Sequence, residues 1–146
     1  MSESDPPIFA LLNEIGIIEQ LARNRFERLQ PDGLRLPHFA VLNHLVRLGD
    51  GRGPAQIARA FQLTKATMTN TLQRLEARWL VRIEADAEDG RAKRVFLTQT
   101  GRIRRDAAVA GAAMDLAPLA AAMGTTAEAL LPGLRALRSG LDRARD

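Results

Sequence analysis

The 146-residue chain contains no cysteine, no tyrosine, one tryptophan and two histidines. Without cysteine, disulfide bonds, thiolate zinc sites and thiol-based redox sensing are excluded. His38 and His44 are six residues apart in one predicted helix, so they lie about 240° apart around its axis, and no carboxylate is spaced to complete a metal site with either. No Ser/His/Asp or phosphate-loop motif is found. The sequence therefore indicates no metal, no cofactor and no enzymatic activity.

Long hydrophobic segments are also absent. No apolar run approaches the ~20 residues that a membrane-spanning helix requires, and the first residues, MSESDPP, lack the basic stretch and apolar core of a signal peptide. The length fits one domain. We therefore expect a single cytoplasmic domain with no membrane partner.

Positive charge is concentrated in the middle of the chain. The whole sequence carries 21 Lys and Arg against 17 Asp and Glu. Residues 52–105 hold twelve of the basic residues and five of the acidic ones, a net charge of +7, and the remaining residues carry −3. An ordinary arginine-rich protein would spread this excess more evenly. The distribution favours double-stranded DNA as a partner and, with it, a nucleoid-associated location.

Apolar residues recur at helical spacing through most of the chain. The predicted helices cover about 5–29, 37–48, 54–61 and 65–78, and two more begin at 98 and 125. Asp5 is the expected cap of the first helix and Thr64 that of the fourth. Gln30–Gly33 should end the first helix, and the glycine-rich segment 49–54 should form a turn.

The C-terminal third is unusually rich in alanine. Nine of the sixteen residues from 107 to 122 are alanine, which favours helix. Pro118 should kink or end this helix, because it lacks an N–H donor and clashes with the preceding turn. Gly124 should terminate the segment. Thr125–Glu128 predicts a capping box for the last helix, which Pro132 should bend.

A helix-turn-helix followed by a hairpin is the most informative pattern. Gln62-Leu63-Thr64 joins two helices, with the small Ala58 near their crossing, although Gln62 stands where such turns often have glycine. Residues 81–97 then alternate between apolar and charged, as in a two-stranded ribbon. Its apolar face comprises Val81, Ile83, Ala85, Val95 and Leu97. Asp89-Gly90 predicts a tight reversal with positive φ at both positions. Because so short a ribbon is marginal alone, it should pack on the helices as a wing.

The helix over 65–78 has one apolar and one polar face. Met68, Leu72 and Leu75 form the stripe that should pack on the body. The opposite side should enter the major groove, where amides pair with adenine edges and Lys or Arg with guanine or phosphate. Its predicted DNA-binding residues are Lys65, Ala66, Thr67, Thr69, Asn70, Gln73 and Arg74. The alternative is a solvated polar face, but such a face would normally mix charges, and no carboxylate occurs here before Glu76.

The hairpin tip offers Arg91, Lys93 and Arg94 to something negatively charged. Arg91 suits a narrow minor groove, whose negative potential attracts arginine. Asp89 has two interpretations: it pairs with Arg91 and orients the guanidinium, or it only makes the turn.

These motifs, taken together, resemble the MarR family of bacterial transcription regulators over nearly the whole chain. The residues that carry the resemblance are 56–69, Leu75-Glu76 with Leu80-Val81, Asp86 with Asp89 and Arg91, and Leu97-Thr98 with Gly101. The resemblance implies a homodimer with two winged helices below a helical platform, and Arg91 in the minor groove supported by Asp89. It also implies repression that is released by a small, often phenolic ligand. Trp79 departs from the pattern, since the family usually has glycine there to ease a left-handed helix end.

Dimerisation is also expected from the residues themselves. The helix over 8–29 has more apolar positions than one contact face needs, and the last helix adds a leucine stripe. A monomer would also expose the alanine-rich surface after Gly111. The alternative is that these alanines are present only because alanine favours helix. A two-fold symmetric dimer predicts a pseudo-palindromic operator with half-sites about one helical turn apart.

A small-molecule effector site is the least determined feature. A cleft between the first two helices and the post-wing helix would be lined by Leu12, Ile15, His38, Phe39 and Leu42. The alternative is that these residues are plain core, with His38 at the surface.

The expected fold is mainly α with a small β-hairpin: a winged helix-turn-helix lobe over about 35–100, and dimerisation helices over about 5–31 and 102–146. The expected function is sequence-specific transcriptional repression by a homodimer. Two alternatives remain: a winged-helix module that binds protein, and a nonspecific architectural DNA binder. Lys65 and Arg91 argue against the first, and Asn70 and Gln73 against the second.

Overall fold

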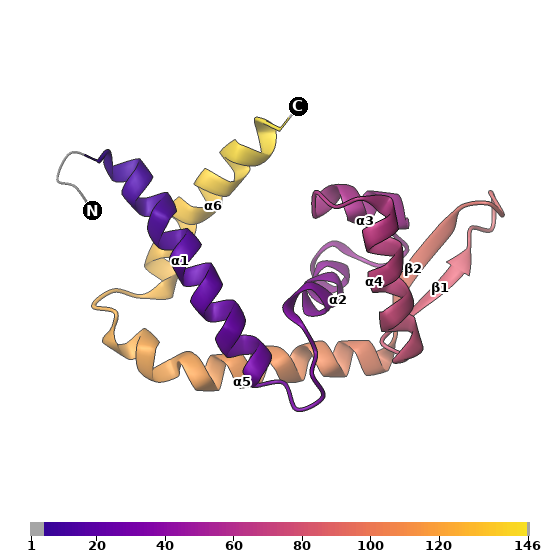
Figure 1. Cartoon of the computed structure of the whole chain (residues 1–146), viewed down its shortest axis with the longest axis horizontal. Helices are drawn as coiled ribbons and strands as arrows, with labels where there is room; N and C mark the ends of the chain where they lie inside the picture. The colour runs from indigo at the N-terminus through magenta and orange to yellow at the C-terminus, as the bar shows by residue number, and fades with distance from the viewer. Residues whose placement is uncertain (1–4, 146) are drawn as a thin grey trace. The chain divides into compact units, whose positions relative to one another are not determined.

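A computed structural model describes residues 5–145 of the chain. Its elements, in order, are α1 (Pro7–Arg28), α2 (Leu36–Leu48), α3 (Pro54–Ala60), α4 (Lys65–Ala77), β1 (Val81–Ala85), β2 (Lys93–Leu97), α5 (Gln99–Ala122) and α6 (Ala127–Arg143) (Figure 1). The chain divides into two compact units, one up to Val109 and one from Ala110 onward. The expectation of a mainly helical fold with one small hairpin is confirmed.

The start of α1 differs from the prediction in its cap. Asp5 is not the cap: Pro6 is the N-cap residue, and no side chain bonds to the first turn. The carbonyl of Pro6 accepts the N–H groups of Phe9 and Ala10 at 2.9 and 3.1 Å. The ring of Pro6 holds φ at −58°, and Pro7 occupies the first helical position, so the two prolines start the helix without a side-chain cap.

The two C-terminal helices are longer than their prolines suggest. α5 continues past Pro118 to Ala122, so that proline does not end the helix, and α6 continues past Pro132. The capping box is wrong by one residue: Thr126 caps α6 by accepting the N–H of Ala129 at 3.1 Å, which leaves Glu128 out of the box position. No single helix within residues 5–145 is long and apolar enough to cross a membrane. α5 and α6 meet the criterion of length and composition only when taken together, and they are bent by 102° at the break between them.

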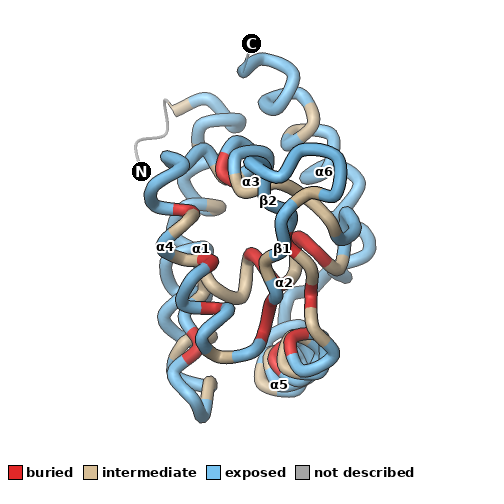
Figure 2. Tube along the Cα trace, turned by 90° about the vertical axis from the view of Figure 1, so that its right-hand side faces the viewer, coloured by how far each residue is buried: buried red, intermediate tan, exposed pale blue. Residues whose placement is uncertain are grey.

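The hydrophobic core of the first unit lies among α2, α3, α4 and the hairpin, where Figure 2 shows most of the buried segments. The predicted stripe of α4 is confirmed, since Met68, Leu72 and Leu75 are all almost completely buried. They pack with Leu42 and Ile57 in one cluster. Burial of this stripe leaves the opposite face of α4 toward solvent.

The hairpin has the predicted apolar face except at Ala85, which is exposed, and it has a different tip. β1 and β2 pair antiparallel with Val81 opposite Leu97 and Ile83 opposite Val95. The strands stop at Ala85 and Lys93, and within residues 86–92 no residue has positive φ, so the two-residue Asp89-Gly90 turn is wrong. The carboxylate of Asp86 instead accepts two main-chain N–H groups of the loop, and the Asp89 carbonyl accepts the N–H of Ala92 at 3.0 Å. These bonds shape a longer loop without left-handed residues.

The segment between α2 and α3 lies along the outer edge of β2. Gly51 donates to the carbonyl of Val95 at 2.9 Å, and Val95 donates to the carbonyl of Arg52 at 2.8 Å. The carboxylate of Asp50 accepts the N–H of Leu97 at 2.8 Å. The segment 49–54, which the sequence predicts only as a turn, therefore covers the edge of the ribbon and fixes the wing to the helix-turn-helix.

The buried His44 should make the stability of the core depend on pH. Its side chain is buried on α2, its ring lies 5.3 Å from that of Phe61, and its Nε2 has no hydrogen-bond partner among the described residues. Burial lowers the pKa of His44, and the nearby charges of Arg52 and Arg47 lower it further. At pH values between the lowered pKa of the folded state and the ordinary pKa of 6.5, His44 therefore binds more protons in the unfolded chain than in the folded chain.

We expect the free energy of unfolding to fall as pH drops from 7.5 to 5.5, by at most about 1.4 kcal/mol per pH unit for each such histidine. Urea unfolding at both pH values measures this effect. His38 shares the direction, because burial and the charge of Arg74 lower its pKa too. His44→Gln should reduce the pH dependence and His38→Gln should remove the remainder. Equal stability of the unsubstituted protein at both pH values would contradict the prediction.

Candidate nucleic-acid interface

The recognition face of α4 is exposed along its length. Six of the seven predicted residues are exposed, and only Thr69 is half-buried: the exposed ones are Lys65, Ala66, Thr67, Asn70, Gln73 and Arg74. Glu76, the first carboxylate on this helix, turns away and accepts the N–H of Ile83 on β1 at 2.9 Å. The exposed face therefore carries two cations and two amides without a competing carboxylate.

The N terminus of α4 is fixed by the predicted cap. The Thr64 hydroxyl oxygen accepts the N–H of Thr67 at 3.1 Å, and the same hydroxyl donates to Oγ1 of Thr67 at 2.8 Å. The hydroxyl of Thr67 thus serves the cap as well as the exposed face. A capped first turn holds Lys65 and Ala66 in one orientation.

Two non-glycine residues, Gln62 and Trp79, adopt the left-handed backbone conformation directly after α3 and α4. Gln62 has φ 54° after α3, and Trp79 has φ 60° after α4. In each case the main-chain N–H of the following residue donates to a carbonyl in the last turn of the helix. Leu63 donates to Ala58 at 2.9 Å, and Leu80 donates to Leu75 at 3.0 Å. Both helices therefore end in a Schellman motif, the geometry that normally favours glycine. Trp79 takes the family geometry despite its side chain, which is 78% exposed.

Trp79→Gly should stabilise the protein. A left-handed conformation costs a residue with a Cβ about 1 kcal/mol, and the exposed indole has little packing to lose. We therefore expect the free energy of unfolding to rise by roughly 1 kcal/mol in urea titrations followed by circular dichroism. Trp79→Ala is the matched control, because it removes the indole but keeps the Cβ. An equal gain in both variants would assign the effect to the indole and not to the backbone.

The basic residues of the wing have different roles. Arg91, Lys93 and Arg94 are all exposed, and the Nε of Arg94 also donates to the carbonyl of Gly51 at 2.8 Å and lies 3.8 Å from the carboxylate of Asp86. Arg94 is thus bound to the segment between α2 and α3. The carboxylate of Asp89 accepts the main-chain N–H of Arg91 at 3.1 Å, so in this structure it makes the turn, as one of its two interpretations expects.

The base of the wing is joined tightly to α5. The hydroxyl of Thr98 donates to the carbonyl of Trp79 at 2.6 Å and accepts the N–H of Gly101 at 2.9 Å. A Cβ built on Gly101 would lie 2.0 Å from the carbonyl oxygen of Leu80. The sequence marked Thr98 and Gly101 only as part of a family motif. Their role depends on a contact with the end of α4, which no local pattern could reveal.

The predicted effector-site residues lie in different environments. Leu42 is fully buried in the core, His38 and Phe39 are half-buried on α2, and on α1 Leu12 is exposed and Ile15 half-buried. A surface hollow on α1 is lined by Leu21, Asn24, Glu27 and Arg28 and includes none of the five.

A helix-turn-helix with a basic exposed helix and a basic wing tip defines a winged-helix DNA-binding protein. The MarR family model matches residues 32–92, so this part of the chain, which holds the helix-turn-helix and the wing, is similar to the MarR family. The similar solved structures are transcriptional regulators and not enzymes, and this chain has the fold of these DNA-binding regulators.

Solved structures share the fold over nearly the whole chain. The transcriptional regulator BldR from Sulfolobus solfataricus aligns with a TM-score of 0.76 and 25% identity, over 95% of this chain and 99% of its own. A probable transcriptional regulator from Pseudomonas aeruginosa aligns at 0.61 and 29% identity, over 90% and 98%. CouR from Rhodococcus jostii RHA1, bound to p-coumaroyl-CoA, aligns at 0.73 and 22% identity, over 96% and 95%.

Proposed function

We propose that the chain is a homodimeric, sequence-specific repressor whose α4 enters the major groove and whose wing tip enters the minor groove. The observation that carries this proposal is the exposed face of α4, which is basic and amide-bearing and has no carboxylate from Lys65 to Arg74. Asn70 and Gln73 supply base-reading amides, and Arg91 supplies a cation for the narrow groove. Lys93 and the half-exposed Arg94 are further cations of the wing for DNA, and Arg94 also bonds to Gly51.

The dimer is supported by apolar side chains that the single chain leaves in solvent. None of the residues of α1 is buried, and its large exposed apolar residues are Ile8, Phe9, Leu11, Leu12, Ile17, Ile18 and Leu21. None of the residues of α6 is buried either, and in the second unit Met114, Leu119, Leu130 and Leu141 are exposed. Surfaces of this kind are uncommon on monomers and typical of interfaces. We assign the segments 5–31 and 102–146 to dimerisation and the segment 35–100 to DNA binding.

Release by a small molecule is the remaining part of the proposal. CouR, which has the same fold, binds p-coumaroyl-CoA. On α2 the half-buried His38 and Phe39 and the buried Leu42 are the candidates for such a site. The ring of Phe39 lies 4.8 Å from that of Phe26 near the end of α1, whereas Leu12 and Ile15 lie about three turns or more before Phe26 on the same helix. A ligand lodged there would contact α2, which packs against α4 in the core.

The decisive experiment is selection of fragmented genomic DNA by the purified protein at physiological salt, followed by sequencing. We expect a short inverted repeat with half-sites about one helical turn apart. Enrichment without a common motif would support an architectural DNA binder instead. No enrichment at all would support a module that binds protein.

A further inference from the structure

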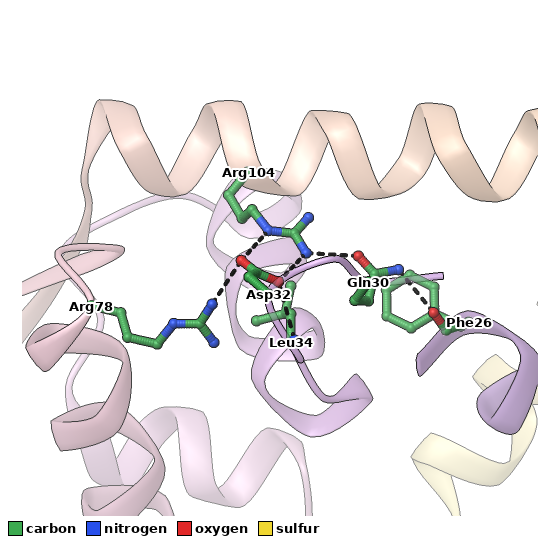
Figure 3. Close-up of polar contacts among 6 residues, drawn as sticks. All are labelled: Phe26, Gln30, Asp32, Leu34, Arg78 and Arg104. Carbon is green, nitrogen blue, oxygen red and sulfur yellow. Dashed lines mark hydrogen bonds and ion pairs between the residues drawn. The ribbon is translucent and has the colours of Figure 1, made fainter. Parts of the chain in front are cut away.

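One carboxylate, that of Asp32 in the turn between α1 and α2, connects separate elements of the first unit (Figure 3). Its Oδ1 accepts Nη2 of Arg104 at 2.7 Å and the main-chain N–H of Leu34 at 3.2 Å. Its Oδ2 accepts Nε of Arg104 at 2.8 Å and Nη2 of Arg78 at 2.7 Å. Arg104 lies on α5 and Arg78 is the C-cap residue of α4, so Asp32 joins the recognition helix to the post-wing helix.

The same cluster includes the end of α1. Nη2 of Arg104 also donates to Oε1 of Gln30 at 2.7 Å, and Nε2 of Gln30 donates to the carbonyl of Phe26 in the last turn of α1 at 2.9 Å. Figure 3 shows the two guanidinium groups approaching Asp32 from different elements. The cluster therefore ties together α1, the following turn, α4 and α5.

Among residues 5–145, Asp32 is the one carboxylate that pairs with both Arg78 and Arg104. The hydrogen bonds from Arg104 hold the pKa of Asp32 well below its usual range, and the Leu34 N–H and the charge of Arg78 act in the same direction. The side chain of Arg104 is only 15% exposed, and that of Arg78 is 33% exposed. Without the carboxylate, two partly buried cations would face each other with no anion between them. The bidentate geometry and partial burial distinguish this cluster from an exposed ion pair, which would contribute little.

The cluster acts at the place where the recognition helix ends. Arg78 directly precedes the left-handed Trp79, and the next residue, Leu80, lies against Gly101 of α5. We propose that Asp32 is a positioning residue for DNA recognition: by binding Arg78 and Arg104 together, it fixes the end of α4 to α5 and sets the angle at which the α4 face meets DNA. The link to DNA rests on the proposed function, whereas the coupling of α4 to α5 does not.

Asp32→Asn tests this role, because it removes the charge and keeps the shape. We expect amide hydrogen exchange at Trp79 and Leu80 to accelerate at least about tenfold, exchange at Val95 in β2 to stay unchanged, and Trp79 emission to shift. Operator affinity should fall about tenfold. Since the substitution removes a negative charge, electrostatics alone would strengthen DNA binding. A loss of operator affinity therefore reports geometry.

Three further variants sharpen the test. Asp32→Glu keeps the charge and should restore part of the exchange protection and of the affinity. Asp106→Asn is the matched control and should leave both readouts unchanged. Within residues 5–145, Asp106 pairs only with its neighbour Arg105 on α5, at 3.0 Å. Arg78→Met removes only the bond to α4 and leaves the fork of Arg104 on Asp32. Arg78→Met should accelerate exchange at Trp79 and Leu80 and leave exchange at Val95 unchanged, even if Asp32→Asn does not fold.

Wild-type exchange at Trp79 and Leu80 in Arg78→Met would overturn the proposal. An accelerated exchange at Val95 equal to that at Trp79 would also overturn it, because it would indicate general destabilisation. If the unsubstituted protein selects no DNA sequence, the proposed function fails, and the exchange comparison still decides whether Asp32 couples α4 to α5.

Discussion

Gly101→Ala should destabilise the protein by about 3 kcal/mol or more, the largest effect of any single-methyl change we expect. The added Cβ would lie 2.0 Å from the carbonyl oxygen of Leu80 and 2.9 Å from Cδ1 of Leu97. Leu97 can adjust its side chain, but the Leu80 carbonyl is main chain and already accepts the N–H of Thr98 at 3.2 Å. Relief therefore requires α5 to move away from the end of α4. Urea unfolding followed by circular dichroism measures the loss.

Gly111→Ala on the same helix is the control. A Cβ there meets nothing within 4 Å, so the substitution should be neutral or stabilising by up to about 1 kcal/mol, because alanine favours helix more than glycine. Similar destabilisation in both variants would show that the effect comes from helix flexibility and not from the contact with Leu80.

Arg91→Ala should weaken operator binding at least about tenfold and should lower the salt dependence of binding by about one unit for each subunit. Arg91 is exposed at the wing tip, and the only bond that the structure shows for it within residues 5–145 is the one from its main-chain N–H to Asp89. Its guanidinium is thus available for a groove or phosphate contact. Fluorescence anisotropy with labelled operator DNA, from 50 to 300 mM salt as an approximate range, gives both quantities.

Arg82→Ala on the same hairpin is the matched control for charge. The Arg82 guanidinium forms an ion pair with Glu84 and lies 4.7 Å from the centre of the Phe96 ring, so it is used within the fold. We expect little change in the salt slope for this variant. An unchanged slope and affinity for Arg91→Ala would remove the wing tip from the DNA-binding proposal.

Local patterns predicted most elements of the first unit. The buried stripe of α4, the Thr64 cap and the apolar face of the hairpin follow from periodicity and side-chain chemistry within a few residues. The errors occurred where two local signals compete. At the start of α1 the prolines replaced Asp5 as the starting signal, and at α6 Thr126 replaced Thr125 as the cap. At residues 86–92 the Asp86 carboxylate organised a longer loop than Asp-Gly alone predicts.

Contacts between residues distant in sequence could not be predicted in this way. Asp32 was expected only to help end the first helix, and its partners lie 46 and 72 residues further along the chain. Arg94 was expected to face DNA, and its side chain is half exposed, but its additional bond to Gly51 spans 43 residues and has no local signal. A charged side chain has the same local sequence whether it binds DNA or another part of its own chain.

The sequence by itself determined the helix-turn-helix with its basic wing, because helical and strand periodicity, caps and charge distribution are properties of neighbouring residues. Only the tertiary structure decided which basic residues remain available to DNA, since this depends on the carboxylates and carbonyls that folding places beside them. Arg78 and Arg104 are partly buried against Asp32, and Arg94 bonds to Gly51 with half of its side chain still exposed, whereas Arg91 and most of the α4 face are exposed. Packing also required glycine at position 101, because the backbone of α5 passes directly against that of Leu80.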